Sequence, residues 1–391
     1  MTFDTVPRSP ENDHSEEAAA ARRAFVEQKT GVALAHTGRY SFDPASTAGN
    51  IENFTGVAQM PLGFAGPLLV DGEHAKGAFY VPMATTEGTL VASYGRGMSV
   101  TRAAGGVKTT IVDDAMQRAP VFVFEDARQA RDFGLWLRDA FPQIKAAAES
   151  TTRSGRLRDI QQFAAAKMLY LRFNFTTGDA AGQNMCGKAT DAACKWIASN
   201  YDGPLSRFVL SGGMDTDKKY SQINTLHSRG KRVVAEVVLP RDLLRDKLRA
   251  TPEALFASRL TSQIGSMMAG ATLNGVHAAN GVAAMFIALG QDEANVAESG
   301  AAILYAEITP GGDYYLSATL PSLIVASYGG GTGLPTQREC LESLGCYGAG
   351  NVMKLAEIVA AAVLCGELSL SAAIVSDEWV GSHDAHGRNR P

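Results

Sequence analysis

The chain has 391 residues, a hydrophobic fraction of 46%, a charged fraction of 19% and a formal net charge of −4. This length suits two domains with sizeable cores, and the lack of a basic tract argues against nucleic acid or a membrane surface as a partner. Five cysteines without a C-x-x-C pair indicate reduced thiols, and no metal site is predicted. The polar, acidic start is neither a secretory nor a transit sequence, so we expect a cytoplasmic protein.

The first part of the chain predicts a helix, then strands, then a second helix. Residues 1–50 form an N-terminal segment with a polar lead-in and a predicted helix in "EEAAAARRAFVEQKTG". The Gly- and Pro-rich stretch "ENFTGVAQMPLGFAGPLLVDG" predicts strands and turns. In "ATTEGTLVASYGRGMSVTRAAGG", a Thr/Glu start precedes apolar residues at helical spacing, which predicts a helix.

Residues 120–209 alternate between strand and helix patterns. The stretches "PVFVFED", "MLYLRFNFTTGD" and "SRFVLSGG" are predicted strands, separated by the predicted helices "ARQARDFGLWLRDAFPQIKAAAES" and "NMCGKATDAACKWIASNY". This order favours a ferredoxin-like small domain, inserted into a large domain of residues 51–119 and 210–380. The predicted fold class is therefore α+β, with a large helix-rich domain around a central buried helix.

A long uncharged run lies between Arg259 and Asp292. Its length would allow a membrane helix, but its polar side chains and five glycines argue against one. We therefore predict that this run forms the helix at the centre of the large domain. Further on, "YYLSATLPSLIVASYGGGTGLP" predicts strands and a triple-glycine loop, and "NVMKLAEIVAAAVLCGELSLSAAIVSDEW" predicts one or two buried helices before a polar tail, residues 381–391.

The stretch "SGGMDTDKKYSQIN", residues 211–224, places Asp217 beside Lys218 and Lys219. On a solvated face, two lysines need no partner. In a polar turn, a lysine near an acid could instead stay charged and stabilise an oxyanion, whereas a neighbouring lysine would favour a neutral, nucleophilic amine. The local sequence leaves these readings open.

Other polar residues also have two readings. Glu87 opens an apolar helix, either as a capping or dipole-favoured acid or as a proton donor. Asp292 follows the uncharged run, either as a cap or as the partner of a lysine. His383 and His386 of the tail are either solvated or, near neutral pH, able to act as a general acid. Arg153 offers a cation for a 2′-phosphate, and the glycine-rich stretches "GDAAGQN" and "YGGGTG" could approach phosphates, although neither is a recognised nucleotide motif.

A set of motifs in this order resembles the 3-hydroxy-3-methylglutaryl-coenzyme A reductases from about residue 50 onward. The motifs are "ENFTG", "GFAGPL", "PMATTEG", "GDAAGQNM", "DTDKK", "HAANGVAA", "GQDEAN", "GGGTGLP", "GELSL" and "SHDAHGRNR". The tail is similar to the soluble catalytic part of the class I form. The resemblance implies a two-step reduction of the hydroxymethylglutaryl thioester to mevalonate and coenzyme A, with NADPH favoured over NADH. It also implies a dimer or tetramer whose active sites lie at the subunit boundary.

The resemblance also implies roles for individual residues. Lys218 would hold the carbonyl oxygen as it becomes an oxyanion, and Glu87 would protonate the aldehyde-level intermediate. Asp292 would link these two groups, and His383 would protonate the departing thiolate. The implied substrate contacts are Ser93, Arg96, Arg118, Ser211, Asp217, Lys219, Asn280 and Leu370. The implied cofactor contacts, with Arg153 at the 2′-phosphate, are Arg153, Asp179, Asn184, Met185, Gly329, Gly330, Gly331 and Thr332.

The loop around the two lysines departs from the family pattern. Gly213 stands where the family usually has Asn, Asp215 where it has Cys, and "YSQ" (from Tyr220) where it has Pro-Ala-Ala. The alternative function is therefore reduction of a related acyl thioester with a different acyl group.

Overall fold

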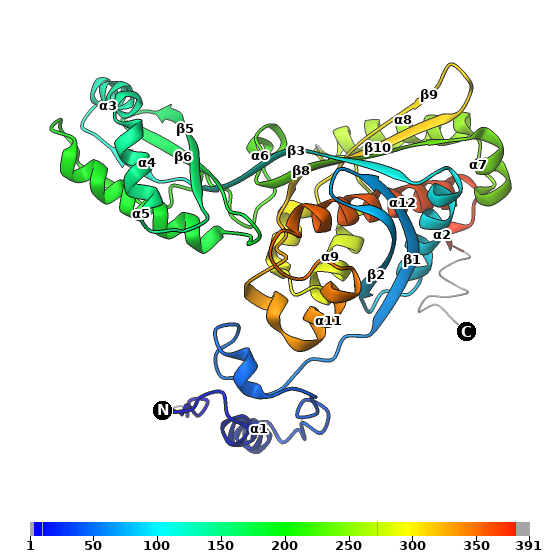
Figure 1. The fold of residues 1–391 in the computed structure, drawn as a ribbon, viewed down its shortest axis with the longest axis horizontal. Coiled ribbons are helices and arrows are strands. Elements are labelled where there is room, and N and C mark those ends of the chain that lie inside the picture. Colours follow the sequence, from blue (N-terminus) through cyan, green and yellow to red (C-terminus); the bar gives the residue numbers. More distant parts are fainter. Residues whose placement is uncertain (1–3, 10, 272, 381–391) are drawn as a thin grey trace.

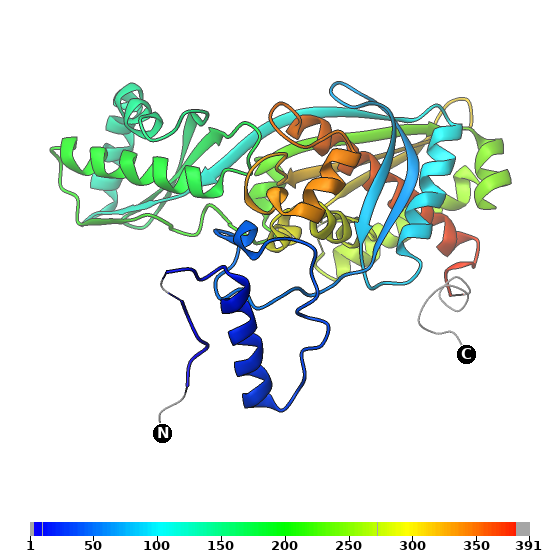
Figure 2. The same ribbon diagram turned by 60° about the horizontal axis from the view of Figure 1, so that its bottom comes forward.

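The structure is a computed structural model that describes residues 4–9, 11–271 and 273–380. It contains both helices and sheet, which confirms the predicted α+β class. A large unit and a small unit share the long strand β3 (Val107–Arg118), which runs from one into the other (Figure 1). In the N-terminal segment, helix α1 (Glu16–Thr30) lies away from both units (Figures 1 and 2).

The sheet of the large unit is centred on β3 and β8 (Gly230–Leu239), which pair antiparallel. On the far side of β8, β10 (Tyr314–Leu323) and then β9 (Ile303–Ile308) continue the antiparallel order. The first strand, β1 (Leu62–Gly72), pairs in parallel with the start of β3 and antiparallel with β2 (Lys76–Ala84). Alternate residues of β8 are buried, as expected for a strand with one covered face.

Helix α12 (Val352–Val375) is the central helix of the large unit. It is also the one helix in the described residues long and apolar enough to cross a membrane, and 78% of its most apolar 18-residue window is buried inside the fold. Helix α2 (Leu90–Ala103) packs closely on it, because a Cβ at Gly97 would collide with the Cys365 carbonyl. One or two buried helices were predicted for the stretch that begins at Asn351, and the structure has one, α12.

The prediction that the uncharged run forms the central helix is wrong. It forms two helices, α8 (Pro252–Met268) and α9 (Ala278–Ala288), and only α9 is largely buried. Gly270 adopts a left-handed conformation just after α8 (φ 76), which ends the helix. Asn274 then exchanges side-chain hydrogen bonds with the backbone of Leu304 at 2.6 and 3.0 Å, fixing the connection against β9.

The small unit contains the three predicted strands as β4, β6 and β7, adds the strand β5, and divides the first predicted helix into α3 and α4. Its sheet has the antiparallel order β7-β4-β6, with β5 on the other side of β6, and it encloses a hydrophobic core of its own around Phe122, Phe133 and Phe173. The elements are β4 (Val121–Val123), α3 (Ala127–Asp139), α4 (Phe141–Glu149), β5 (Arg156–Ala165), β6 (Met168–Thr176), α5 (Gln183–Asn200) and β7 (Arg207–Val209).

The remaining elements connect these units. The loop after β7 and the short helix α6 lie where the two units meet (Figure 1). The bounds are α6 (Gln222–Leu226), α7 (Arg241–Leu248), α10 (Val296–Ser299), α11 (Pro335–Ser343), and the 3-10 helices η1 (Pro44–Thr47), η2 (Glu293–Asn295) and η3 (Gly330–Gly333).

Candidate active site

The two residues at the centre of the site are Lys218 and Asp292. Lys218 lies in the loop between β7 and α6, and its Nζ is 2.8 Å from Asp292 Oδ2. Asp292 also caps η2 by accepting the Ala294 N–H at 3.1 Å, so both roles considered for it are present. The hydrogen bond that Lys218 donates to Asp292 raises the pKa of Lys218, which keeps its ammonium charged and disfavours the neutral-amine reading.

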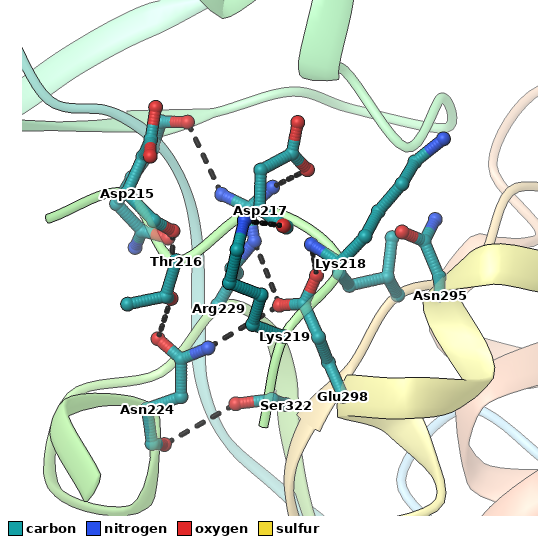
Figure 3. A network of polar contacts seen from close by, with 12 residues as sticks. Asp215, Thr216, Asp217, Lys218, Lys219, Asn224, Arg229, Asn295, Glu298 and Ser322 are labelled. Atoms are coloured by element: carbon teal, nitrogen blue, oxygen red, sulfur yellow. Dashed lines mark hydrogen bonds and ion pairs between the residues drawn. The ribbon is translucent and has the colours of Figure 1, made fainter. Parts of the chain in front are cut away.

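The backbone around Lys218 has an unusual conformation. Thr216 and Lys218 have φ values of 53° and 57°, in the left-handed region that non-glycine residues rarely adopt. Figure 3 shows the polar network that surrounds this turn. Glu298 accepts the Lys218 N–H at 2.5 Å, and Asp217 lies 2.5 Å from Nη2 of Arg229. The turn is therefore held by side chains from other segments of the chain.

The expected substrate contacts Arg118 and Ser211 lie at the same loop, but both are engaged by an internal acid. Asp215 is only 2% exposed, and its Oδ2 accepts from Arg118 Nη1 at 2.9 Å and from Ser211 Oγ at 3.1 Å. Arg118 Nη2 lies 3.8 Å from Asp217 as well. Lys219 is exposed, and its Nζ donates to the Asp217 carbonyl at 3.1 Å.

A cavity of about 580 Å³ opens beside Asp292. Among the expected cofactor contacts, Asn184, Met185 and the three glycines 329–331 line it. Its wall includes the N-terminus of α5, where Gly182 is the N-cap with φ 83° and the first N–H groups are free to bind an anion. The cavity thus combines glycine-rich backbone and a helix N-terminus, a combination suited to phosphate groups.

Asp179 and Thr332 do not line this cavity but shape it. Asp179 joins the two glycine-rich stretches, because its carbonyl accepts the Ser327 N–H at 3.0 Å and its Oδ1 accepts from Ser327 Oγ at 3.2 Å and the Val352 N–H at 3.3 Å. Thr332 is buried and donates to the Gly329 carbonyl at 2.8 Å. Arg153 is exposed and lines neither this cavity nor the next.

A second cavity, of about 380 Å³, holds another group of expected residues. They are Glu87, Ser93, Arg96, Asn280 and Leu370. Glu87 is exposed on the loop before α2, and it does not cap that helix, because Thr89 occupies the N-cap. The capping reading of Glu87 is therefore wrong.

The wall of the second cavity is a hydrogen-bonded chain centred on His277. His277 Nε2 and Ser93 Oγ are 3.2 Å apart, and Asn280 Nδ2 is 3.1 Å from His277 Nδ1. Arg96 Nε donates to Ser369 Oγ at 3.0 Å. The sequence reasoning missed His277 as a site residue, although it begins the quoted motif "HAANGVAA".

The predicted catalytic residues are therefore only partly together within one chain. Lys218 and Asp292 form one group and Glu87 belongs to the other, and among the described residues the two cavities share no lining residue. His383, like His386, lies outside the described residues. Trp379, close to the end of the described chain, lines the Glu87 cavity.

Comparison with known proteins gives the family. The family model described as hydroxymethylglutaryl-coenzyme A reductase matches residues 18–388. Relatives named 3-hydroxy-3-methylglutaryl-coenzyme A reductase are 47% identical over 381 residues in Pyrococcus abyssi and 44% identical over 380 residues in Methanocaldococcus jannaschii, each covering 95% of this chain and 93% of the relative.

Solved structures agree in fold. A class II 3-hydroxy-3-methylglutaryl-CoA reductase from Streptococcus pneumoniae, bound to NADPH in open conformations, has a TM-score of 0.69 and 20% identity, covering 85% of this chain and 89% of that one. At this identity the likeness concerns the fold alone. With the family model spanning nearly the whole chain, these findings show that the chain belongs to the hydroxymethylglutaryl-coenzyme A reductase family.

Proposed function

We propose that this chain reduces 3-hydroxy-3-methylglutaryl-coenzyme A to mevalonate and coenzyme A in two steps, with NADPH as the reductant. The observation that carries this proposal is the Lys218–Asp292 pair, a charged ammonium beside the 580 Å³ cavity with its glycine-rich wall. Negative charge develops on the carbonyl oxygen when hydride is added, and a preorganised ammonium stabilises it. The names of the relatives support the substrate.

The cavity beside Asp292 fits a nicotinamide dinucleotide. Asn184, Met185 and the glycine loop would hold it, with phosphate groups at the N-terminus of α5, and when bound it supplies the hydride. The turn that carries Arg153 borders this cavity, because a Cβ at Gly155 would come within 2.5 Å of Met185 Sδ. The nearness of this turn to the cavity supports our proposal that Arg153 binds a 2′-phosphate and that NADPH is used in preference to NADH.

We assign the small unit, residues 120–209, as an inserted ferredoxin-like domain that binds this cofactor. Its antiparallel strand order and its separate core support the assignment. The large domain, residues 51–119 and 210–380, would hold the substrate and coenzyme A, residues 1–50 would form the N-terminal segment, and residues 381–391 the catalytic tail with His383.

The reaction also requires proton donors, which we assign to Glu87 and His383. Glu87 would protonate the aldehyde-level intermediate, and His383 would protonate the coenzyme A thiolate as it leaves. Because Glu87 and Lys218 belong to different parts of one chain, we propose that each active site takes Lys218 and Asp292 from one copy and Glu87 from a second.

Helix α8 supports this homo-oligomer. Its C-terminal half is uncharged and exposed, with Leu260, Ile264, Met267 and Met268 between 47% and 81% exposed. An apolar helix face of this kind usually marks a protein interface, and in a closed symmetric dimer the same face serves both copies.

A second candidate function is reduction of a related acyl thioester without a terminal carboxylate. The contacts of Asp215 favour it, because this buried acid already occupies Arg118 and Ser211. A terminal carboxylate on the acyl group would have to compete with Asp215 or depend on Lys219.

An assay with purified protein separates these functions. We expect NADPH oxidation with hydroxymethylglutaryl-coenzyme A, slower oxidation of NADH, and loss of both in Lys218→Ala. A panel of acyl thioesters in the same assay tests the second candidate, which requires a better substrate than hydroxymethylglutaryl. No turnover with either nucleotide would rule out the first.

A further inference from the structure

Glu298 of helix α10 lies directly beneath the Lys218 turn (Figure 3). It is 1% exposed, yet its carboxylate accepts two hydrogen bonds and forms an ion pair with Arg229. Oε1 accepts the Lys218 N–H at 2.5 Å, and Oε2 lies 2.8 Å from Arg229 Nε and 3.2 Å from Asn224 Nδ2. An ionised carboxylate can only accept hydrogen bonds, so these two donors and the neighbouring guanidinium match the charged form of Glu298.

The orientation of these donors is itself fixed. Asn224 Oδ1 accepts from Arg172 Nη2 and from Thr216 Oγ1, both at 2.9 Å, so its amide nitrogen must face Glu298. Arg229 is fully buried and lies between Glu298 and Asp217. Removing either acid would leave a buried guanidinium with fewer partners.

One short segment, residues 292–299, contacts the Lys218 turn directly at two points and is linked to it at a third through Gln183. Asp292 pairs with the Lys218 ammonium, and Glu298 binds the Lys218 backbone. Between them, Asn295 accepts from Gln183 at 2.9 Å, and the same Gln183 nitrogen donates to Asp217 at 3.0 Å. The three residues are three positions apart, which places them on one side of the 3-10 and helical turns.

The turn needs such support. Left-handed backbone at a residue with a side chain persists only where the surroundings enforce it, and Lys218 and Thr216 both have this conformation. The Glu298 contact is made to the nitrogen of the very residue whose side chain reaches Asp292. Residues 292–299 therefore hold both the backbone nitrogen and the side-chain ammonium of Lys218.

We propose that Glu298, together with Arg229, is a positioning residue that fixes the Lys218 backbone so that its ammonium meets Asp292. Glu298 itself does not touch the reacting atoms. This inference rests on the role proposed for Lys218 and goes beyond it, because it assigns the geometry of the oxyanion-holding group to a buried acid outside both cavities.

Burial gives this acid a second property. Desolvation raises the pKa of Glu298 to about 7, although Arg229 and the Lys218 N–H act in the opposite direction. The groups that face it are Arg229, Asn224, Lys218 and Asp217. Below about pH 7 the protonated carboxyl loses its ion pair with Arg229, so the hold on Lys218 weakens as the pH falls.

The test compares two buried glutamates. Glu298→Gln keeps an oxygen for the Lys218 N–H but turns an amide donor toward Arg229 and Asn224. Glu357→Gln is the matched control, because Glu357 is also fully buried and accepts three backbone N–H groups, from Glu73, His74 and Ala75, in the β1–β2 turn. The measurements are steady-state kinetics, thermal stability and the titration of Lys218 by NMR of ¹³C-lysine-labelled protein, assigned with Lys218→Arg.

We expect Glu298→Gln to lower kcat by about tenfold or more, since a small displacement of a reacting group has effects of this size. KM for NADPH should stay within about threefold of wild type, because the cofactor cavity is not touched. The Lys218 titration should move to lower pH as the Asp292 contact is lost. Glu357→Gln should lower thermal stability while kcat and the Lys218 titration stay unchanged.

A wild-type Lys218 titration in Glu298→Gln would overturn the inference, whatever happens to stability. If Glu298→Gln does not fold, Arg229→Lys tests the same contact, because an ammonium cannot reach both Glu298 and Asp217 as the guanidinium does; an unchanged Lys218 titration there would equally overturn it. If the wild-type chain does not oxidise NADPH with hydroxymethylglutaryl-coenzyme A, the proposed function fails, and the NMR titration still decides the role of Glu298.

Discussion

The Lys218 loop and the Glu87 cavity hold residues proposed for one reaction, but the chain builds them differently. At the loop, Lys218 and the neighbouring Arg118 and Arg229 each have an acidic partner from the same chain. Glu87, in contrast, is exposed. It lines a cavity that is also lined by Trp379, close to the end of the described chain. One chain can therefore preorganise the positive charge for the oxyanion, whereas the proton donor is presented outward, as a second copy would require.

The largest expected effect comes from removing the charge at the centre of the loop. Lys218→Ala should lower kcat by roughly 10²–10³-fold, the loss expected when one oxyanion-stabilising group is removed. NADPH binding, followed by nucleotide fluorescence, should not change. Lys195→Ala is the control, because Lys195 pairs with Asp191 on the exposed face of α5. Turnover retained in Lys218→Ala would show that another group holds the oxyanion.

Replacing Asp292, the partner of Lys218, should lower kcat less and should also change the pH dependence of the rate. The hydrogen bond that Lys218 donates to Asp292 raises the pKa of Lys218, so the wild-type ammonium persists to higher pH than it would without this partner. Asp292→Asn removes this contribution, and the alkaline limb of the pH–rate profile should move to lower pH, with kcat reduced by about tenfold. An alkaline limb at the same pH in both proteins would mean that Lys218 does not control it.

The contacts of Asp215 concern which acyl group the site binds, and not the reduction itself. Asp215→Asn should free Arg118 and Ser211 for a terminal carboxylate. KM for hydroxymethylglutaryl-coenzyme A should fall by about tenfold, the size of one hydrogen bond to a charged group. A thioester that lacks the carboxylate serves as the control, and its KM should not fall. Equal changes for both substrates would exclude a role in acyl selection.

The last prediction concerns the choice between NADPH and NADH and leaves the chemical step itself unchanged. Arg153→Ala should raise KM for NADPH by about tenfold and leave KM for NADH unchanged, because only NADPH carries the 2′-phosphate. Parallel kinetics with the two nucleotides measure this ratio. If both KM values rise together, Arg153 acts on the fold of the 150–155 turn and not on the phosphate.

The sequence predicted the fold where the physical signal is local. Apolar alternation identified β4 and β6, and apolar helical spacing identified α2 and α5. Strand β5 was not predicted, because half of its sequence, "RLRDIQQFAA", is polar and its side chains are largely exposed or half-buried. The uncharged run was assigned to the centre of the fold because composition alone does not distinguish α9, which is buried, from the exposed half of α8.

The site divides in the same way. The resemblance supplied Lys218 and Asp292, and the structure brings them into contact across 74 positions of sequence, from 218 to 292. It did not indicate Glu298 or Arg229, whose burial depends on tertiary contacts with the Lys218 turn and not on any neighbouring motif. Nor did it indicate that Asp215 would occupy Arg118, because that contact links positions far apart in the sequence.

The most direct test of the difference between the two regions is complementation between inactive variants. Glu87→Gln and Lys218→Ala are purified separately, shown to be inactive, then unfolded, mixed and refolded together. If each active site joins Glu87 of one copy to Lys218 of another, mixed dimers contain one intact site, and about a quarter of wild-type NADPH oxidation should return. A mixture that forms mixed dimers and stays inactive would contradict the account.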